Sequence, residues 1–207
     1  MKITKYLHSC VLVEHEGKTV LFDPGNYAFN GGDFNYGALP ALDYILITHE
    51  HQDHFYLPFV VKLKDRFPGV MIISTPSVAK KLLQENIECS LVGNELVDVT
   101  NIPHEELLGQ GPENIRFDVF SKLTHPGDSL QFYNSNEILL LPIQAPWGSL
   151  VAAVKKAAEI KPRMVIPIHD WHWRDEARVG LYGMAEVYLQ EHGVEFRGLE
   201  SGEAIEV

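Results

Sequence analysis

Three histidines and an aspartate lie within six residues, in the segment His49-Glu50-His51-Gln52-Asp53-His54. Imidazole nitrogens and carboxylate oxygens bind Zn²⁺, and also Mn²⁺ or Fe²⁺. Because alternate residues of an extended segment point the same way, His49 and His51 can reach one cation, and Asp53 and His54, which follow where the chain turns, can reach a second. The alternative, three solvated histidines on a polar loop, crowds imidazoles together without a cation, which is unfavourable near their pKa values. The spacing therefore predicts a metal site.

Three more residues of ligand type follow predicted strands later in the chain. His104 comes after a strand ending near residue 102, Asp128 sits in a tight turn, and His169 closes an apolar run over residues 165–168. The carboxyl ends of strands are where the sites of α/β folds assemble. Each of these residues alone could be structural, but together with the segment 49–54 they favour a second set of ligands.

The elements that must position these residues alternate between strands and helices, with strands first, then strand-helix-strand order, and then the same again. Strands are expected over residues 2–7, 10–15, 19–23, 44–47, 70–74, 96–102, 115–122, 130–133, 138–141, 164–168 and 194–197. Helices are expected over 57–67, 76–86, 147–160 and 175–192, with a hairpin turn at 134–136 and a long loop, functional or merely a surface excursion, over 24–40. This order predicts one α/β domain over residues 1–207, built as two similar halves with sheets inside and helices outside.

The segment 48–54, followed in order by His104, Gly127-Asp128 and Ile168-His169, resembles the metallo-β-lactamase fold superfamily. The likeness extends from residues 21–25 to His169, and it implies a four-layer αββα sandwich. It also implies one metal held by His49, His51 and His104, another held by Asp53, His54 and His169, and a bridging Asp128. Asp23 looks like the superfamily's aspartate that orients ligands without binding metal, the alternative being a turn-forming residue.

The third histidine departs from the Gly-His-Thr type of motif, because this chain has Pro103-His104-Glu105. Together with the start at His8-Ser9-Cys10, this resembles the branch that contains ascorbate-6-phosphate lactonase. His8 resembles a family position near the site, although a hydrogen-bonded strand histidine is an equal reading. Arg174 is the cation nearest in sequence to the candidate ligands and is the candidate anion contact.

The composition limits the partners. Seventeen Lys and Arg against 28 Asp and Glu give a net charge of -11, with no basic run, so no nucleic-acid partner is expected. The absence of a long apolar stretch or secretory signal, together with only two cysteines, favours a cytoplasmic protein with reduced thiols and no membrane partner. A homo-oligomer is compatible with the sequence. Two cations would make the pocket locally positive, which favours a small anionic or oxygen-rich substrate.

The leading hypothesis is therefore a metal-dependent hydrolase with two divalent ions, most simply Zn²⁺, with Mn²⁺ or Fe²⁺ as alternatives. A hydroxide bridging the metals would cleave a small ester, lactone or phosphodiester, and Asp53 would accept and return the proton. The competing hypotheses are an iron-dependent oxygenase or redox enzyme on the same fold, a metal-dependent nuclease, and a non-catalytic relative.

Overall fold

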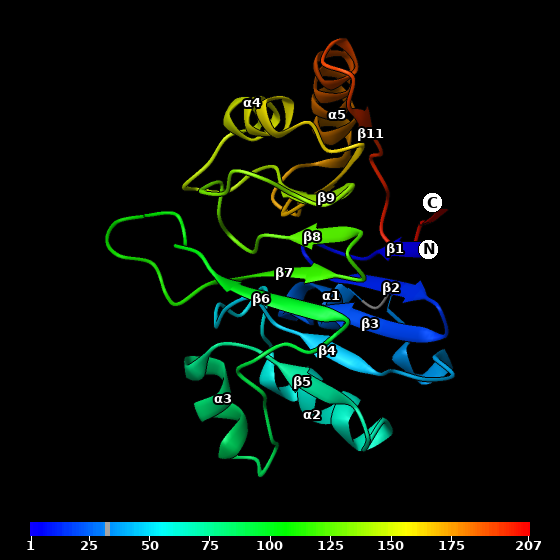
Figure 1. Ribbon diagram of the computed structural model, residues 1–207, viewed down its shortest axis with the longest axis vertical. Coiled ribbons are helices and arrows are strands. Elements are labelled where there is room, and N and C mark those ends of the chain that lie inside the picture. Colours follow the sequence, from blue (N-terminus) through cyan, green and yellow to red (C-terminus); the bar gives the residue numbers. More distant parts are fainter. Residues whose placement is uncertain (32–33) are drawn as a thin grey trace. The chain divides into compact units, whose positions relative to one another are not determined.

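Two six-stranded mixed sheets organise the computed structural model, which describes residues 1–31 and 34–207 (Figure 1). The first unit comprises Met1–Gly93 with Glu200–Val207, and the second comprises Asn94–Leu199. In each unit a sheet is flanked by helices, so the α/β class is confirmed. The single domain over residues 1–207 stays a prediction.

The sheet of the first unit has the strand order β12-β1-β2-β3-β4-β5. Its strands are β1 (Lys2–Lys5), β2 (Val11–His15), β3 (Lys18–Phe22), β4 (Tyr44–Leu46), β5 (Met71–Ile73) and β12 (Ala204–Glu206). β12, β1, β2 and β3 pair antiparallel, whereas β3, β4 and β5 pair parallel. A parallel pair needs a crossover connection, and α2 (Leu57–Arg66) supplies it between β4 and β5.

Helix α2 and helix α3 (Pro76–Leu83) pack on the β4–β5 side of this sheet. Phe59 and Leu63 of α2 and Leu82 of α3 are fully buried in one apolar cluster with Ile45 of β4. Thr75 caps the start of α3, because its hydroxyl accepts a hydrogen bond from the Val78 amide at 3.4 Å. This packing fixes β4, whose carboxyl end leads directly into the histidine-rich segment.

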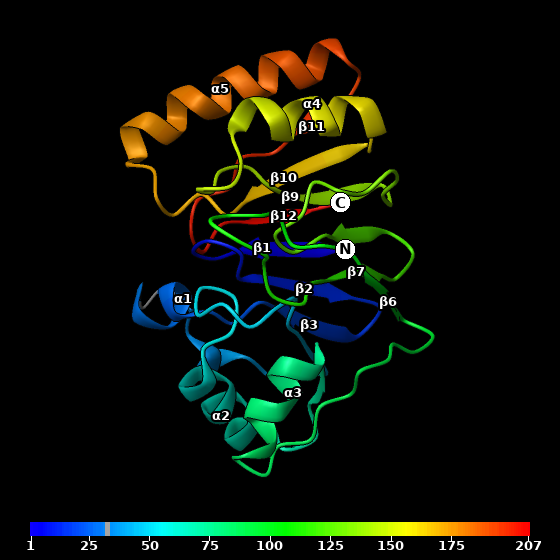
Figure 2. The same ribbon diagram turned by 90° about the vertical axis from the view of Figure 1, so that its left-hand side faces the viewer.

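The sheet of the second unit has the strand order β11-β10-β9-β8-β7-β6. Its strands are β6 (Val97–Asn101), β7 (Ile115–Val119), β8 (Leu123–His125), β9 (Ile138–Pro142), β10 (Met164–Ile168) and β11 (Glu195–Phe196). Helices α4 (Leu150–Ile160) and α5 (Asp175–Glu191) lie side by side, as Figure 2 shows. Both helices pack in one cluster with residues of β9, β10 and β11. This packing fixes β10, whose carboxyl end is followed directly by His169.

The connection between β8 and β9 differs from the prediction. No strand forms over residues 130–133, and β8 pairs parallel with β9, so residues 134–136 are not a hairpin turn. The alternation that mimics a strand arises because Phe132 is buried in the apolar cluster while Tyr133 is exposed. The segment from 126 to 137 is instead a long crossover, and it carries Asp128.

The expected loop over residues 24–40 contains two short helices, α1 (Asn26–Gly31) and η1 (Tyr36–Ala38). Gly32 and Asp33, which fall in that predicted loop, lie outside the described residues. The edge strand β12 was not predicted from the sequence. It is short and half-exposed, so it lacks the apolar run that marks a strand.

The two cysteines are free thiols, as predicted. Burial raises the pKa of the Cys89 thiol to about 11, and burial together with the Asp23 charge raises that of Cys10 further. Both thiols are therefore protonated at neutral pH. Among the helices the structure describes, none has the length and hydropathy needed to span a bilayer.

Candidate metal centre

The carboxyl end of β4 presents a tight group of imidazoles in the first unit. His49 and His54 are fully buried, with ring centroids 4.1 Å apart. The Nε2 atom of His49 lies 3.1 Å from Nδ1 of His51, which is half-buried. The amides of His54 and Phe55 both donate to the carbonyl of His51, at 3.0 Å and 2.7 Å, so a turn brings the end of the segment back toward its start. The structure thus brings these three predicted ligands together.

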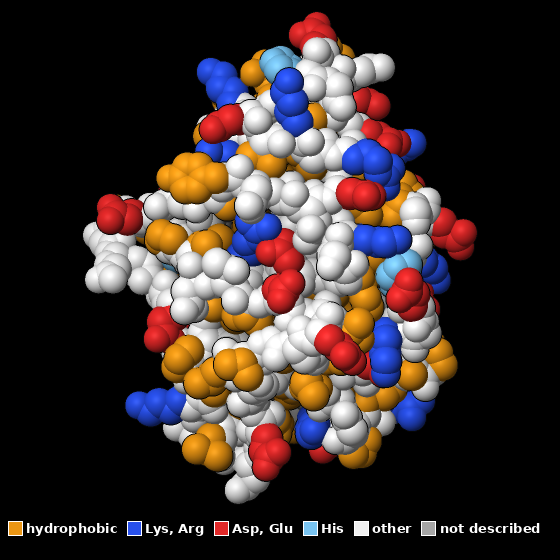
Figure 3. Space-filling view, viewed as in Figure 1, with side chains coloured by type: hydrophobic (Ala, Val, Ile, Leu, Met, Phe, Trp, Pro, Cys, Tyr) orange, Lys and Arg blue, Asp and Glu red, His pale blue; other side chains and the backbone are white. Residues whose placement is uncertain are grey.

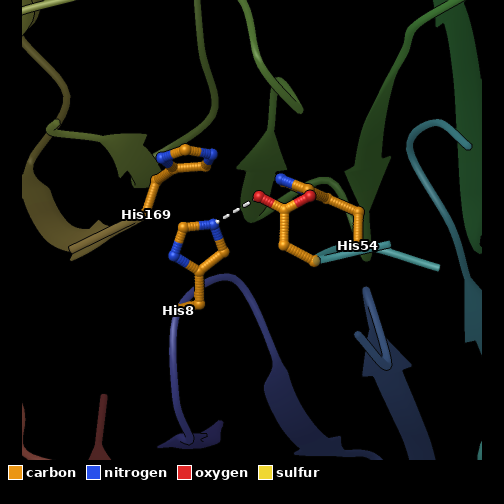
Figure 4. Close-up of side chains that lie close together, drawn as sticks. His8, His54 and His169 are labelled. Atoms are coloured by element: carbon orange, nitrogen blue, oxygen red, sulfur yellow. Dashed lines mark hydrogen bonds and ion pairs between the residues drawn. The ribbon is translucent and has the colours of Figure 1, made fainter. Parts of the chain in front are cut away.

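Asp53 and His54 form a second cluster with His8. The ligand atoms of these three residues lie within 4.8 Å of one another. His8 Nε2 is 3.1 Å from Asp53 Oδ2, the dashed line in Figure 4. His8 lies in the turn between β1 and β2 with a φ of 65°, so the reading as a strand histidine is wrong.

Asp23 is fully buried beneath this group and accepts three hydrogen bonds. Its Oδ1 accepts from the Thr48 amide at 2.8 Å, and its Oδ2 accepts from the Thr48 hydroxyl at 2.9 Å. Oδ2 also lies 2.7 Å from His54 Nδ1. A proton on Nδ1 leaves the Nε2 lone pair of His54 for a metal, which is how carboxylates commonly orient ligating histidines. These contacts fit the predicted orienting role, although Asp23 itself has a φ of 43° as in a turn.

Replacement of Asp23 by Asn tests this role. The amide of Asn must direct its NH₂ at one of the donors, so we expect metal to bind about 10- to 100-fold more weakly. Competition with a chromogenic chelator measures this affinity. The same substitution at the exposed Asp65 on α2 is the control and should leave the affinity unchanged. Equal affinities for the two variants would contradict an orienting role for Asp23.

In the second unit, Asp128 lies between two histidines. Its Oδ2 is 3.1 Å from His169 Nε2 and 3.5 Å from His104 Nε2, and all three residues are buried. The Nδ1 atoms of the two rings face backbone carbonyls, His104 toward Glu105 at 2.6 Å and His169 toward Gln144 at 2.5 Å. A proton on each Nδ1 therefore directs both Nε2 atoms to the carboxylate.

The β8–β9 crossover is held by side chains so that Asp128 points to these histidines. The Asn114 side chain accepts from the Asp128 amide at 3.2 Å and donates to the Pro126 carbonyl at 3.1 Å. His125 Nδ1 accepts from the Gly127 amide at 3.0 Å, so this histidine caps the turn that leads to Asp128. Beside His104, a Cβ on Gly111 would lie 2.7 Å from the imidazole Nδ1, so only glycine fits there.

Three neighbours of the site were missed from the sequence. The Trp147 indole donates to Asp128 Oδ2 at 3.3 Å, and the Thr48 hydroxyl lies 3.0 Å from His49 Nδ1. Tyr27 of α1 stands 5.2 Å from the His8 ring, and burial, followed by the Asp53 charge, raises its pKa. None of these contacts has a sequence signature. Trp147 and Tyr27 each reach a residue 19 positions away in the chain, and the contact of Thr48 with His49 depends on a side-chain rotamer.

Arg174 and several other polar and aromatic residues lie outside the groups of candidate ligands. Arg174 is exposed immediately before α5, and its role as an anion contact stays a prediction. Trp173 packs against the apolar cluster of the second unit, whereas Trp171 is exposed. His15 lies 3.5 Å from Glu16, and His192 is exposed with its Nδ1 2.8 Å from the Tyr188 carbonyl.

The chemistry of the donor set fits divalent transition metals. Each unit gathers imidazole nitrogens and a carboxylate in or next to a buried position, and these are the donors that Zn²⁺, Mn²⁺ and Fe²⁺ prefer. Without a cation, such crowding of ionisable groups away from water would be costly. The residues present therefore fit a metal-binding role in both units.

Comparisons with known proteins identify the family and the fold of this chain. The chain is 30% identical to protein Rv0786c of Mycobacterium tuberculosis over 88% of this chain and 90% of that protein. It is 31% identical to a UPF0173 metal-dependent hydrolase of Carboxydothermus hydrogenoformans over 84% of this chain and 86% of that protein. The metallo-β-lactamase fold protein YhfI of Bacillus subtilis superposes with a TM-score of 0.73 at 15% identity, covering 100% of this chain and 99% of YhfI.

The structural likeness to YhfI confirms the predicted metallo-β-lactamase fold, whereas the branch with ascorbate-6-phosphate lactonase stays a prediction. The family model described as the beta-lactamase superfamily domain matches residues 2–169, a span that includes every candidate ligand. This match and the 30% identity to Rv0786c show that the chain belongs to the beta-lactamase superfamily domain family.

Proposed function

We propose that this chain is a metal-dependent hydrolase with a binuclear centre that cleaves a small ester, lactone or phosphodiester. The observation that carries the proposal is the buried carboxylate of Asp128 with two imidazole Nε2 atoms at 3.1 Å and 3.5 Å. This group fits a ligand set better than a structural ion pair. In each ring Nδ1 faces a backbone carbonyl, so the proton lies on Nδ1 and the lone pair of Nε2 faces the carboxylate. The relative from Carboxydothermus hydrogenoformans, named as a metal-dependent hydrolase, supports the same class.

The proposed ligand sets are those that the resemblance to the metallo-β-lactamase fold superfamily implies. One metal would be held by His49, His51 and His104, and the other by Asp53, His54 and His169, with Asp128 shared between them. Bound cations of this kind lower the pKa of water toward neutrality and polarise a substrate oxygen.

Residues of the chain then transfer the proton that the reaction releases. Hydrolysis forms a bond from a water oxygen to the carbonyl carbon or phosphorus and breaks the bond to the leaving oxygen. Asp53 accepts the proton that the water loses and returns it to the leaving oxygen, so the carboxylate is regenerated in each cycle. His8 holds Asp53 Oδ2 at 3.1 Å and limits the rotation of that carboxylate. Asp23 keeps His54 in one orientation.

We propose a small, anionic or oxygen-rich substrate rather than a nucleic acid. The net charge of -11 repels polyanions at long range. On the face shown in Figure 3, Lys and Arg side chains are scattered among Asp and Glu and gather into no continuous basic patch among the described residues. A small anion does not need such a patch, since two cations and Arg174 would supply the local positive charge.

Removal and return of metal tests the proposed activity. Protein stripped with a chelator should lose hydrolysis, and Zn²⁺, Mn²⁺ or Fe²⁺ should restore it at about two equivalents per chain, measured by elemental analysis. The substrates are p-nitrophenyl acetate, a γ-lactone followed by pH-stat titration, and bis-p-nitrophenyl phosphate. Full activity in stripped protein would overturn the proposal. Oxygen consumption by the iron-loaded protein, without hydrolysis, would establish the oxygenase alternative instead.

A further inference from the structure

The indole of Trp147 approaches the Asp128 carboxylate from a short turn between β9 and α4. In this turn the Gly148 amide donates to the Ala145 carbonyl at 3.1 Å. The Ser149 hydroxyl then caps α4 by accepting from the Ala152 amide at 3.2 Å. The side chain of Trp147 is thus fixed between a closed turn and a helix start. From there its Nε1 donates to Asp128 Oδ2 at 3.3 Å.

The same ring contacts both histidines of the group in the second unit. The Trp147 ring is nearly perpendicular to that of His104, at 71° and 6.3 Å between centroids. It is tilted by 55° to His169 at 5.8 Å. One half-buried side chain therefore contacts all three candidate ligands of the second unit.

An indole is suited to hold a carboxylate without competing for metal. Its N–H only donates, it has no lone pair for a cation, and it does not ionise near neutral pH. The backbone of Asp128 is already held by Asn114, and the rings of His104 and His169 are oriented by carbonyls. These contacts do not fix the rotation of the Asp128 carboxylate about its side-chain bonds. The hydrogen bond from the indole N–H restricts that rotation.

We propose that Trp147 is a positioning residue that orients the Asp128 carboxylate for metal binding. This inference rests on the proposed function only in that a metal binds to Asp128. Loss of an outer hydrogen bond to a ligand typically weakens metal affinity about 10- to 100-fold. We expect an effect of that size from Trp147→Phe, which removes the N–H and keeps an aromatic ring.

The test compares two single variants, Trp147→Phe and Trp171→Phe. Zn²⁺ affinity is measured by competition with a chromogenic chelator, and folding by circular dichroism and thermal unfolding. Trp147→Phe should weaken binding about 10- to 100-fold. Trp171→Phe changes an exposed ring outside the Trp147–Asp128 contact and should change affinity less than about twofold. A folded Trp147→Phe protein with wild-type affinity would overturn the proposal, and so would equal losses in the Trp171 variant.

A second measurement covers the case in which Trp147→Phe fails to fold. The chain has three tryptophans, so the double variant Trp171→Phe/Trp173→Phe keeps Trp147 as the single indole. Its emission should change on addition of Zn²⁺ with the same dissociation constant as the chelator competition. No change at saturating Zn²⁺ would overturn the inference.

The two proposals fail in different ways. If the wild-type protein binds no metal at all, the proposed function fails. If it binds metal and hydrolyses its substrates, but changing Trp147 leaves the Zn²⁺ affinity unaltered and its emission does not respond to Zn²⁺, only the positioning role fails.

Discussion

Protein carrying His51→Ala should purify folded, hold fewer metal equivalents than wild type and hydrolyse its substrates at least about 100-fold more slowly. That factor is the upper end for loss of a residue that only orients a ligand, and His51 is proposed as a ligand itself. Its imidazole lies 3.1 Å from that of His49, so its loss removes one of two adjacent nitrogen donors. His51 is half-buried, so truncation leaves no closed apolar cavity and should cost little stability.

The matched control is His15→Ala. His15 is also a half-buried histidine of the first unit, but it lies at the end of β2 beside Glu16. This variant should keep the metal content and the rate of wild type. The comparison uses metal content from elemental analysis and initial rates of hydrolysis, both measured on the same samples of the two variants and wild type. Wild-type metal content in folded His51→Ala protein would remove His51 from the ligand set.

Gly25→Ala should damage both the fold and the candidate site. A Cβ at residue 25 would lie 1.8 Å from the Asp53 carbonyl oxygen and 2.9 Å from the His54 amide nitrogen. Both are backbone atoms, so no flexible side chain can move away. The surrounding contacts also resist separation: the Asn26 amide donates to the Gln52 carbonyl at 2.8 Å and the Tyr56 amide to Pro24 at 3.1 Å.

We expect Gly25→Ala to lose about 3 kcal/mol of unfolding free energy or more, since overpacking against rigid neighbours lies at the upper end of such substitutions. For a domain of this size that corresponds to a fall in melting temperature of about 6 to 12 °C. Because Asp53 and His54 must move, metal affinity should fall in whatever fraction stays folded. Differential scanning calorimetry on metal-free protein separates the two effects.

Gly69→Ala is the control for this substitution, because a Cβ at residue 69 meets no atom within 4 Å. It should melt within about 1 °C of wild type. If Gly25→Ala melted as high as Gly69→Ala, the close approach of residue 25 to the histidine-rich segment would be wrong.

The candidate ligands could be identified from the sequence because their pattern is local. His49, His51, Asp53 and His54 lie in one short segment after a buried strand, so composition and spacing suffice to predict a site. The apolar runs of β4 and β10 likewise identify the strands that deliver His49 and His169, with errors of a residue or two at strand ends.

What could not be predicted depends on contacts between distant segments. The 130–133 segment has the alternation of a strand, but it packs as a loop and forms no ladder, so pattern alone misplaced it. The hydrogen bond from the Trp147 indole to Asp128 depends on a turn that positions the indole. A tryptophan in a sequence first suggests apolar packing, so this contact with a candidate metal ligand could not be predicted. The need for glycine at 25 becomes visible only once two backbone segments are placed in contact.

Three residues of the candidate site adopt left-handed backbone conformations. The φ angles of His8, Asp23 and His169 are 65°, 43° and 63°. Each such conformation costs a non-glycine residue about 1 kcal/mol or more, which glycine would avoid. A lineage that no longer needed the imidazoles of His8 and His169 could relieve this backbone strain by accepting glycine at these two positions. Glycine at the equivalents of His8 and His169 would therefore mark those relatives that have kept the fold and abandoned the chemistry.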